Sequence, residues 1–206
     1  MATGAANSQA VWSAIVLAAG AGRRFGGRKL LAPFEGGALL DGALRAAFAS
    51  PASTVILVTG SEADEVAAAA RAWAERQGAG DRLHIIHAAD HAEGMGASLR
   101  AGAAALPADS AGAFVFLGDM PRVPAAVLPR LVEAVGAGAA AAAPVCDGRR
   151  GHPVLFAAEL YAPLRQAAGD EGARAALLGL GPRLALIETD DKGVLFDVDR
   201  PEDLAP

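Results

Sequence analysis

The sequence is short of cysteine, lysine and aromatic residues, and it lacks a long hydrophobic run. Cys146 is its only cysteine, so no disulfide can form within the chain, and this favours a reducing compartment such as the cytoplasm. The longest uncharged stretch ends at Gly22, but its apolar core covers only residues 11–19. A membrane-spanning helix needs about 20 apolar residues, and a secretory signal needs a basic start. The sequence therefore predicts neither of them.

Acidic residues outnumber basic ones, which argues against two classes of partner. The formal net charge is −5 and the isoelectric point is about 5.3, so we expect binding neither to nucleic acid nor to a membrane surface. The 206 residues are 53% hydrophobic, which is typical of one folded domain and excludes a disordered chain. Residues 1–10 are small and polar without periodicity, so they are predicted to form a disordered tail.

Short apolar segments alternate with amphipathic ones along the rest of the chain. Strands are predicted at 12–17, 54–58, 83–87, 113–117 and 139–145, and later at 153–156, 183–188 and 194–196. Helices are predicted from a cap at Asp41 through 48, from Ser61 to 77, at 95–106 and at 123–135, where Pro129 either kinks the helix or marks its start. This alternation predicts an α/β fold with a mainly parallel sheet covered by helices on both faces.

The loop after the first strand combines glycines with four cations. It contains Leu17, Ala18, Ala19, Gly20, Gly22 and Gly26, followed by Lys29, one of only two lysines in the chain. Glycines let backbone N–H groups approach an anion, and Arg24 and Lys29 can neutralise phosphate oxygens. The spacing does not match the Walker A motif, because Lys29 follows Arg28 and precedes Leu30. It does not match the dinucleotide fingerprint either, because the third glycine comes one position late. A phosphate-binding loop is predicted, with a solvated basic turn as the alternative.

This loop resembles the signature L-A-[AG]-G-x-[SG]-x-R-[MF]-G-x-x-K of the nucleotidyltransferases related to molybdenum cofactor cytidylyl- and guanylyltransferases. Further matches to the same family follow in order at 93–102, 117–121, 151–156 and 197–204, and residues 169–174 also resemble it. The resemblance implies a single Rossmann-like three-layer domain over 11–206, with 11–145 binding the nucleotide and 146–206 forming the acceptor side. Arg200 stands where the family usually has threonine.

The same resemblance implies roles for several residues. Ala19 is similar to the cytidylyl-transferring branch, where the guanylyl branch carries glycine. Gly94 and Ser98 are expected to contact the base or ribose. The implied acceptor is molybdopterin or its molybdenum form, and a molybdenum hydroxylase would receive the product.

Two carboxylates are candidates for binding Mg²⁺. Asp119 ends an apolar strand at the edge where ligands bind in such sheets, and there a carboxylate suits a magnesium ion that bridges phosphate oxygens. A helix N-cap is the alternative for Asp119. Asp197 and Asp199 lie two apart in a predicted strand, so both carboxylates would point to one face. Either one could be a second metal ligand, and the family resemblance favours Asp199; an exposed strand face is the alternative.

Arginine and histidine residues mark the predicted acceptor side. Arg149 and Arg150 form a basic turn that could attract a phosphorylated acceptor, and His152 follows it. The alternatives are a solvated turn and a histidine that merely orders it. The other histidines, at positions 84, 87 and 91, are predicted to be structural, since an offset of three on a strand puts two of them on opposite faces.

Together these observations predict transfer of CMP from CTP onto a phosphate-bearing acceptor, with release of pyrophosphate. A phosphate monoester is already ionised at neutral pH, so no general base is needed. Arg24, Lys29 and Asp119 are the predicted catalytic residues. Three other functions remain open: transfer from GTP or to another acceptor such as a sugar phosphate or cofactor precursor, an NAD(P)H- or flavin-dependent oxidoreductase, and a non-catalytic cofactor chaperone.

Overall fold

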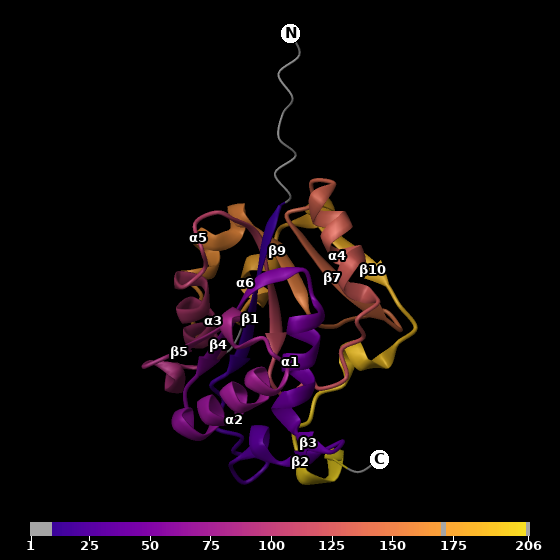
Figure 1. Ribbon diagram of the computed structural model, residues 1–206. Helices are drawn as coiled ribbons and strands as arrows, with labels where there is room; N and C mark the ends of the chain where they lie inside the picture. Colours follow the sequence, from indigo (N-terminus) through magenta and orange to yellow (C-terminus); the bar gives the residue numbers. More distant parts are fainter. Residues whose placement is uncertain (1–9, 170–171, 205–206) are drawn as a thin grey trace.

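A computed structural model describes residues 10–169 and 172–204 (Figure 1). The tail predicted over residues 1–10 lies outside the described residues except for Ala10, and residues 170 and 171 of the family-like segment 169–174 lie outside them as well. The main sheet has the order β10-β7-β9-β6-β1-β4-β5, with β8 paired to β7. Its strands are β1 (Val11–Ala18), β4 (Ala52–Thr59), β5 (Leu83–His87), β6 (Ser110–Leu117), β7 (Ala141–Cys146), β8 (Arg149–Arg150), β9 (Val154–Ala157) and β10 (Leu184–Glu188).

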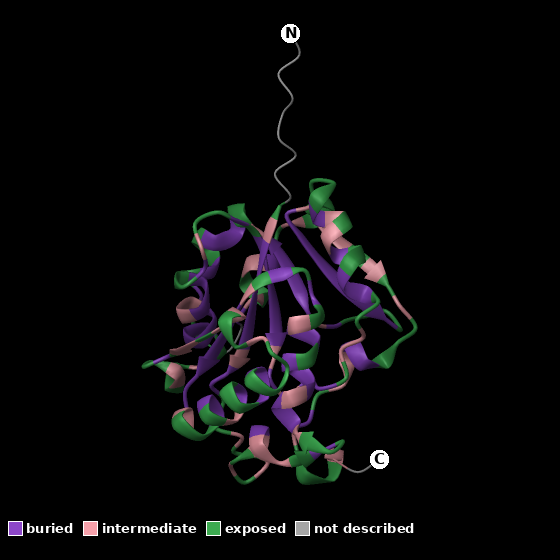
Figure 2. Cartoon of the chain, viewed as in Figure 1, coloured by how far each residue is buried: buried purple, intermediate pink, exposed green. Residues whose placement is uncertain are grey.

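The alternation of side chains along β1 places it at the centre of two hydrophobic layers. Trp12, Ala14 and Val16 pack into the core on one face of the sheet, whereas Ile15 and Leu17 pack into the core on the other. Successive residues of a strand point to opposite faces, so a strand that is apolar at nearly every position must be covered twice. Figure 2 shows the central strands as buried.

Helices cover both faces, as the sequence predicts. The first face carries α1 (Leu39–Ala49), α2 (Ala63–Arg76) and α4 (Val127–Gly136), and the second carries α3 (Met95–Ala104), α5 (Tyr161–Leu164) and α6 (Arg174–Leu177). The predicted α/β fold with a mainly parallel sheet is therefore confirmed. Within the described residues, every helix is too short or too polar to cross a bilayer.

The structure corrects several predicted boundaries. Helix α1 begins at Leu39, so Asp41 is not the cap but accepts a hydrogen bond from the Ala38 N–H from inside the first turn. Helix α2 begins at Ala63 rather than at Ser61, whose N–H donates to the Ala19 carbonyl instead. Pro129 lies in the first turn of α4, where a missing N–H costs nothing, so it marks the start of that helix.

The C-terminal segment is the larger error. Residues 192–195 form a 3₁₀ turn, not the predicted strand over 194–196, because the Asp191 carboxylate accepts the Gly193 N–H and begins a turn. Asp197 and Asp199 follow in irregular structure, so the predicted strand that would align them is also wrong. Strand β9 is antiparallel to both of its neighbours, β6 and β7.

A third and much smaller apolar cluster lies outside the sheet. It joins the two-stranded hairpin of β2 (Pro33–Phe34) and β3 (Gly37–Ala38) to the C-terminal segment, and we call it the small core. Its members are Phe25, Phe34, Leu39, Phe196, Val198 and Leu204. Figure 1 shows the indigo hairpin beside the yellow C-terminal segment, below the sheet.

Candidate active site

A cleft of about 500 Å³ opens at the carboxyl ends of β1 and β6. Ligands of parallel α/β sheets bind at this edge. The near wall is the loop after β1, and the far wall is the segment that leads into α3. The lining residues are Leu17, Ala19, Gly20, Ala21, Gly22, Arg23, His91, Ala92, Gly94, Met95, Ser98, Leu117 and Asp119.

The loop after β1 turns on a glycine. Gly22 has φ +55, and its carbonyl accepts hydrogen bonds from the N–H groups of Phe25, Gly26 and Gly27 at 2.9, 3.1 and 3.2 Å. A Cβ atom at Gly22 would lie 3.0 Å from the Cβ of Lys29. Glycine therefore permits both the left-handed backbone and the close approach of Lys29.

The far wall is held by Arg100 of α3. Its guanidinium contacts the carboxylates of Glu93 at 3.1 Å and Asp90 at 3.5 Å, and it donates to the Ala167 carbonyl at 2.9 Å. These contacts fix the loop before Gly94 against the helix. Ser98, in the first turns of α3, is buried and lines the cleft.

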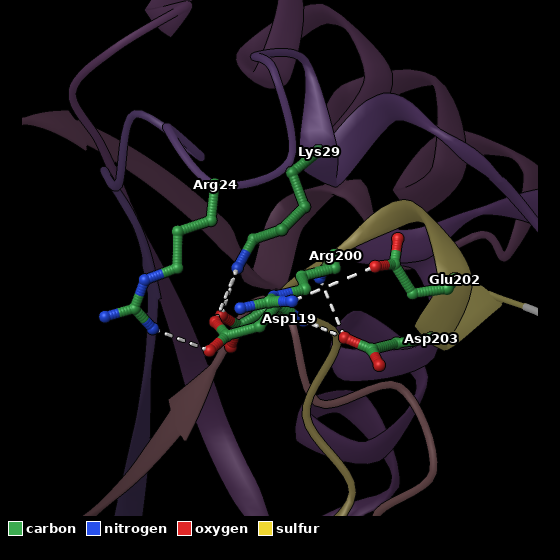
Figure 3. A network of polar contacts seen from close by, with 7 residues as sticks. Arg24, Lys29, Asp119, Arg200, Glu202 and Asp203 are labelled. Carbon is green, nitrogen blue, oxygen red and sulfur yellow. Dashed lines mark hydrogen bonds and ion pairs between the residues drawn. The ribbon is translucent and has the colours of Figure 1, made fainter.

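A network of charges lies beside the cleft (Figure 3). Lys29 Nζ donates to Asp119 Oδ2 at 2.7 Å and lies 3.9 Å from Asp199 Oδ1. Arg24 Nη1 donates to Asp199 Oδ2 at 2.9 Å, across 175 positions of sequence. The Lys29 side chain is only 12% exposed, whereas that of Arg24 is 75% exposed. One largely buried cation and one exposed cation therefore face two carboxylates.

Asp203 fixes the backbone at Asp199. Its carboxylate accepts hydrogen bonds from the N–H groups of Asp199 at 2.9 Å and Arg200 at 2.7 Å. These two bonds stabilise the ionised form and lower the pKa of the Asp203 carboxyl below its ordinary value. The Arg200 side chain, which departs from the family pattern, contacts Glu202 at 4.0 Å, whereas the Asp203 carboxylate contacts the backbone (Figure 3).

Asp119 and Asp199 suit a divalent cation that also binds a substrate phosphate. Mg²⁺ is usually held by one or two carboxylates together with phosphates and water. No group of three or more His, Cys, Asp or Glu side chains in the described part of the chain could hold a metal ion alone. Asp197 lies near the same charges: desolvation, and then the carboxylates of Asp119 and Asp199, raise the pKa of its carboxyl.

A second pocket of about 210 Å³ adjoins the cleft, since Leu17, Met95 and Leu117 line both. Its remaining walls are mostly apolar, but Arg150, His152 and Arg174 also line it. The structure thus brings Arg150 and His152 together. Arg149 does not line this pocket; it is exposed in β8, opposite Cys146.

The surroundings of His152 disfavour its charged form. Burial lowers the pKa of its imidazole, against the opposing effects of a hydrogen bond with the Val115 backbone and the charge of Asp119. Its Nδ1 atom is buried without a hydrogen-bond partner among the described residues. The backbone N–H donates to the Val194 carbonyl at 2.9 Å, which ties the turn to the C-terminal segment.

This burial predicts a pH dependence of stability. An unfolded histidine titrates near pH ~6.5, so below that pH the unfolded chain takes up a proton that the folded chain excludes, and stability falls as pH falls. We expect His152→Gln to lose less stability than the parent chain between about pH 7 and pH 5, measured by urea denaturation. His84→Gln, at an exposed position of β5, is the control. Equal losses in the parent chain and in His152→Gln would contradict this account.

Comparison with known proteins identifies the chain's family. The family model described as the MobA-like NTP transferase domain matches residues 14–184. The chain belongs to this family. The predicted resemblance is thereby confirmed, and the protein is a nucleotidyltransferase of the MobA-like type.

Relatives of this NTP transferase span nearly its whole length. It is 29% identical over 189 residues to the molybdenum cofactor cytidylyltransferase of Escherichia coli K12, covering 92% of this chain and 91% of that protein. It is 32% identical over 198 residues to the nicotine blue oxidoreductase of Paenarthrobacter nicotinovorans, with coverages of 92% and 93%. The crystal structure of Rv0371c from Mycobacterium tuberculosis H37Rv matches with a TM-score of 0.78 at 27% identity, covering 95% and 96%. A complex of Rv0371c with manganese matches with a TM-score of 0.73 at 26% identity, covering 94% and 95%.

The structure places most, but not all, of the predicted nucleotide-binding residues of this transferase in the cleft. Six of the eight line the cleft: Leu17, Ala19, Gly20, Gly22, Gly94 and Ser98. Ala18 is instead buried in the core beneath the loop, because it is the last residue of β1, and Gly26 lies in the outer part of the loop with φ +95.

Six residues that line the transferase cleft were not among the predicted site residues: Ala21, Arg23, His91, Ala92, Met95 and Leu117. Arg23 lines both the cleft and a hollow of about 240 Å³ that it shares with Arg24, Lys29 and Asp199. His91, predicted to be structural, lines the cleft while its Nδ1 lies 3.0 Å from the Ala88 carbonyl. Met95 separates the cleft from the second pocket, and its place in the family-like segment at 93–102 was the available signal.

Proposed function

We propose that this nucleotidyltransferase moves CMP from CTP onto a phosphorylated, pterin-type acceptor and releases pyrophosphate. The observation that carries the proposal is the pairing of Lys29 with Asp119 and of Arg24 with Asp199 beside the 500 Å³ cleft. Cations next to carboxylates give one place where both phosphate oxygens and a divalent cation can be bound.

The cleft's shape supports one orientation of the nucleotide. The base and ribose would lie between the loop after β1 and the start of α3, against Gly94 and Ser98. The triphosphate would then extend toward Arg23, Arg24 and Lys29, which line the adjoining hollow. The exposed Arg24–Asp199 pair contributes little to the stability of the fold. Both side chains can therefore give up this contact and bind a ligand instead.

Charge accounts for the proposed reaction. An ionised phosphate oxygen of the acceptor forms a bond to the α-phosphorus of CTP, while the bond from that phosphorus to the bridging oxygen breaks and pyrophosphate leaves. Lys29 and the arginines would neutralise the negative charge that accumulates on the leaving group. No proton has to be removed from the attacking oxygen at neutral pH.

Asp119 and Asp199 would hold a divalent cation, which we propose to be Mg²⁺. Such an ion supplies charge neutralisation and orientation of the phosphates. The manganese complex of Rv0371c supports a divalent cation in this fold.

The acceptor would occupy the second pocket. Arg150 and Arg174 offer charge for its phosphate, and the mostly apolar walls with the His152 imidazole suit a flat heterocycle. The name of the Escherichia coli relative supports molybdopterin as this acceptor, and a molybdenum hydroxylase would then receive the product. The single, free cysteine supports a cytoplasmic location.

A second candidate is a hydride-transfer enzyme that uses NADPH. The Paenarthrobacter relative, which is named an oxidoreductase and is 32% identical, favours it. Arg23, Arg24 and Lys29 could bind the phosphates of a dinucleotide as they would those of CTP. The two candidates differ in ligand and in metal dependence.

Calorimetric titration of CTP, GTP, ATP and NADPH, with and without Mg²⁺, tests the proposal. We expect CTP binding that depends on the metal. GTP should bind at least tenfold more weakly than CTP, which is a difference of about 1.4 kcal/mol in binding free energy. Ala19, which is 4% exposed in the cleft wall, is the proposed discriminator, so Ala19→Gly should narrow the CTP preference. Ala21→Gly, in the same loop, is the matched control and should not. Tighter binding of GTP than of CTP would contradict the assignment of cytosine as the base. If NADPH binds and none of the three nucleoside triphosphates does, the second candidate is favoured.

A further inference from the structure

The small core connects the two halves of the charge network. Phe25 directly follows Arg24, and Val198 directly precedes Asp199, and both side chains belong to the small core. Arg24 and Asp199 meet although they are 175 positions apart in the sequence. The packing of their neighbours is what brings them together, because an exposed ion pair is too weak to do so.

One side chain closes this cluster from outside. The guanidinium carbon of Arg122 lies 4.3 Å from the ring centroid of Phe196 and 5.2 Å from that of Phe34. The two rings are stacked, with centroids 6.2 Å apart. Arg122 Nε also donates to the Glu35 carboxylate at 2.8 Å. A planar cation over two rings holds the hairpin to the C-terminal segment.

Residues 119–122, which include Arg122, also anchor the C-terminal segment through their backbone. The Val198 N–H donates to the Asp119 carbonyl at 3.0 Å. A Cβ atom at Gly193 would collide with the Arg122 carbonyl. Residues 193–198 therefore run against 119–122, and this brings Asp199 beside Asp119 and Lys29.

We infer that Arg122 is a positioning residue for the nucleotide and metal site: by holding Phe34 and Phe196 together, it sets where Asp199 and Arg24 stand. This inference rests on the proposed function only for what the site binds. Arg122 lines none of the pockets described above and pairs with Glu35 rather than with the charges of the site. The contacts of its side chain lead to the site through the small core.

The rings that Arg122 contacts lie outside the two main hydrophobic cores. The two main cores lie on the faces of the sheet and contain neither Phe34 nor Phe196. Replacing Arg122 should loosen the C-terminal segment while the sheet keeps its stability. If Arg122 had a merely structural role, its replacement would lower the stability of the sheet together with that of the C-terminal segment.

The test uses Arg122→Ala and, as a second variant, Phe196→Leu, which keeps the cluster apolar but removes the ring beneath the guanidinium. Arg183→Ala is the matched control, because Arg183 pairs with Glu159 at the surface, away from the cleft. The first readout is hydrogen exchange of the ligand-free chain. We expect both variants to lose protection at the Asp199 and Arg200 N–H groups, with strands β1 and β4 unchanged and the control unchanged throughout.

The second readout is calorimetric titration of CTP with and without Mn²⁺. We expect both variants to bind CTP in the presence of Mn²⁺ about tenfold or more weakly than the parent chain does. Arg122→Lys, which keeps the charge but not the planar fork, should recover part of the loss.

The outcomes separate the two proposals. Unchanged exchange at residues 199 and 200 in both variants overturns the inference, whatever the ligand results. If Arg122→Ala does not fold, Phe196→Leu decides by the same criterion. If the parent chain fails to bind CTP with Mn²⁺, the proposed function fails, and hydrogen exchange alone still decides whether Arg122 holds the segment.

Discussion

Lys29→Ala is expected to slow nucleotidyl transfer by about 10² or more, on the scale of losing one donor that stabilises charge in a transition state. The Lys29 ammonium is 12% exposed and contacts two carboxylates, so its charge is only weakly screened by water. It is the least solvated of the cations at the site, and no neighbour can replace it without moving. The measurement is the rate of pyrophosphate release with CTP and acceptor at saturation.

The chain provides a matched control for this variant. Lys192 is the only other lysine; its side chain is 81% exposed, 3.7 Å from Asp147. Lys192→Ala should leave the rate unchanged. Less than a threefold loss in Lys29→Ala would contradict a catalytic role. A lowered thermal midpoint in the variant would instead trace the loss to the unpaired Asp119.

Asp119→Asn is expected to reduce turnover by about 10² and to raise the concentration of Mg²⁺ or Mn²⁺ needed for half of the maximal rate. The amide keeps the size and one acceptor oxygen of the carboxylate but removes the charge that would attract a cation. Chelation of divalent metal should abolish the activity of the parent chain. The measurement is the rate as a function of metal concentration at fixed CTP.

Asp109→Asn serves as the control for the loss of an acidic charge, because Asp109 is exposed in the turn between α3 and β6. It should titrate with metal like the parent chain. An unchanged metal dependence in Asp119→Asn would exclude this residue as a metal ligand and leave it the partner of Lys29 alone.

The sheet was largely predictable because its strands are apolar on both faces. Runs such as 54–58 and 113–117 leave no polar side that water could cover, and the apolar pattern then identifies these strands to within about three residues at each end. The strand at 83–87 is confirmed at both ends. The 3₁₀ turn at 192–195 was not predictable, because Val194 is buried by tertiary contacts and so reads like a strand residue.

The order and direction of the strands could not be predicted from the pattern. Hydrophobicity indicates that β9 is buried, but the antiparallel position between β6 and β7 depends on how the chain turns at 147–153. Loop lengths and patterns leave such choices open.

The candidate site was partly predictable, for a different reason. Leu17, Gly22, Lys29 and Asp119 sit at strand ends or in a glycine-rich loop, where the topology rule for ligands applies. Arg122 could not be found in this way. Its role comes from Phe34 and Phe196, which are distant in sequence and carry no local pattern that relates them to it.

The strand order also has a consequence for folding during translation. The four main-sheet strands made first, β1, β4, β5 and β6, lie side by side as β6-β1-β4-β5, whereas β7 and β10 lie beyond β9. A nascent chain can thus assemble a contiguous parallel block early, but the outer edge of β6 stays bare until β9 emerges. An unpaired edge is an opportunity for aggregation. Asp199 is translated later still, so a ribosome-bound chain can present the glycine-rich loop after β1 well before the Asp199 carboxylate is made.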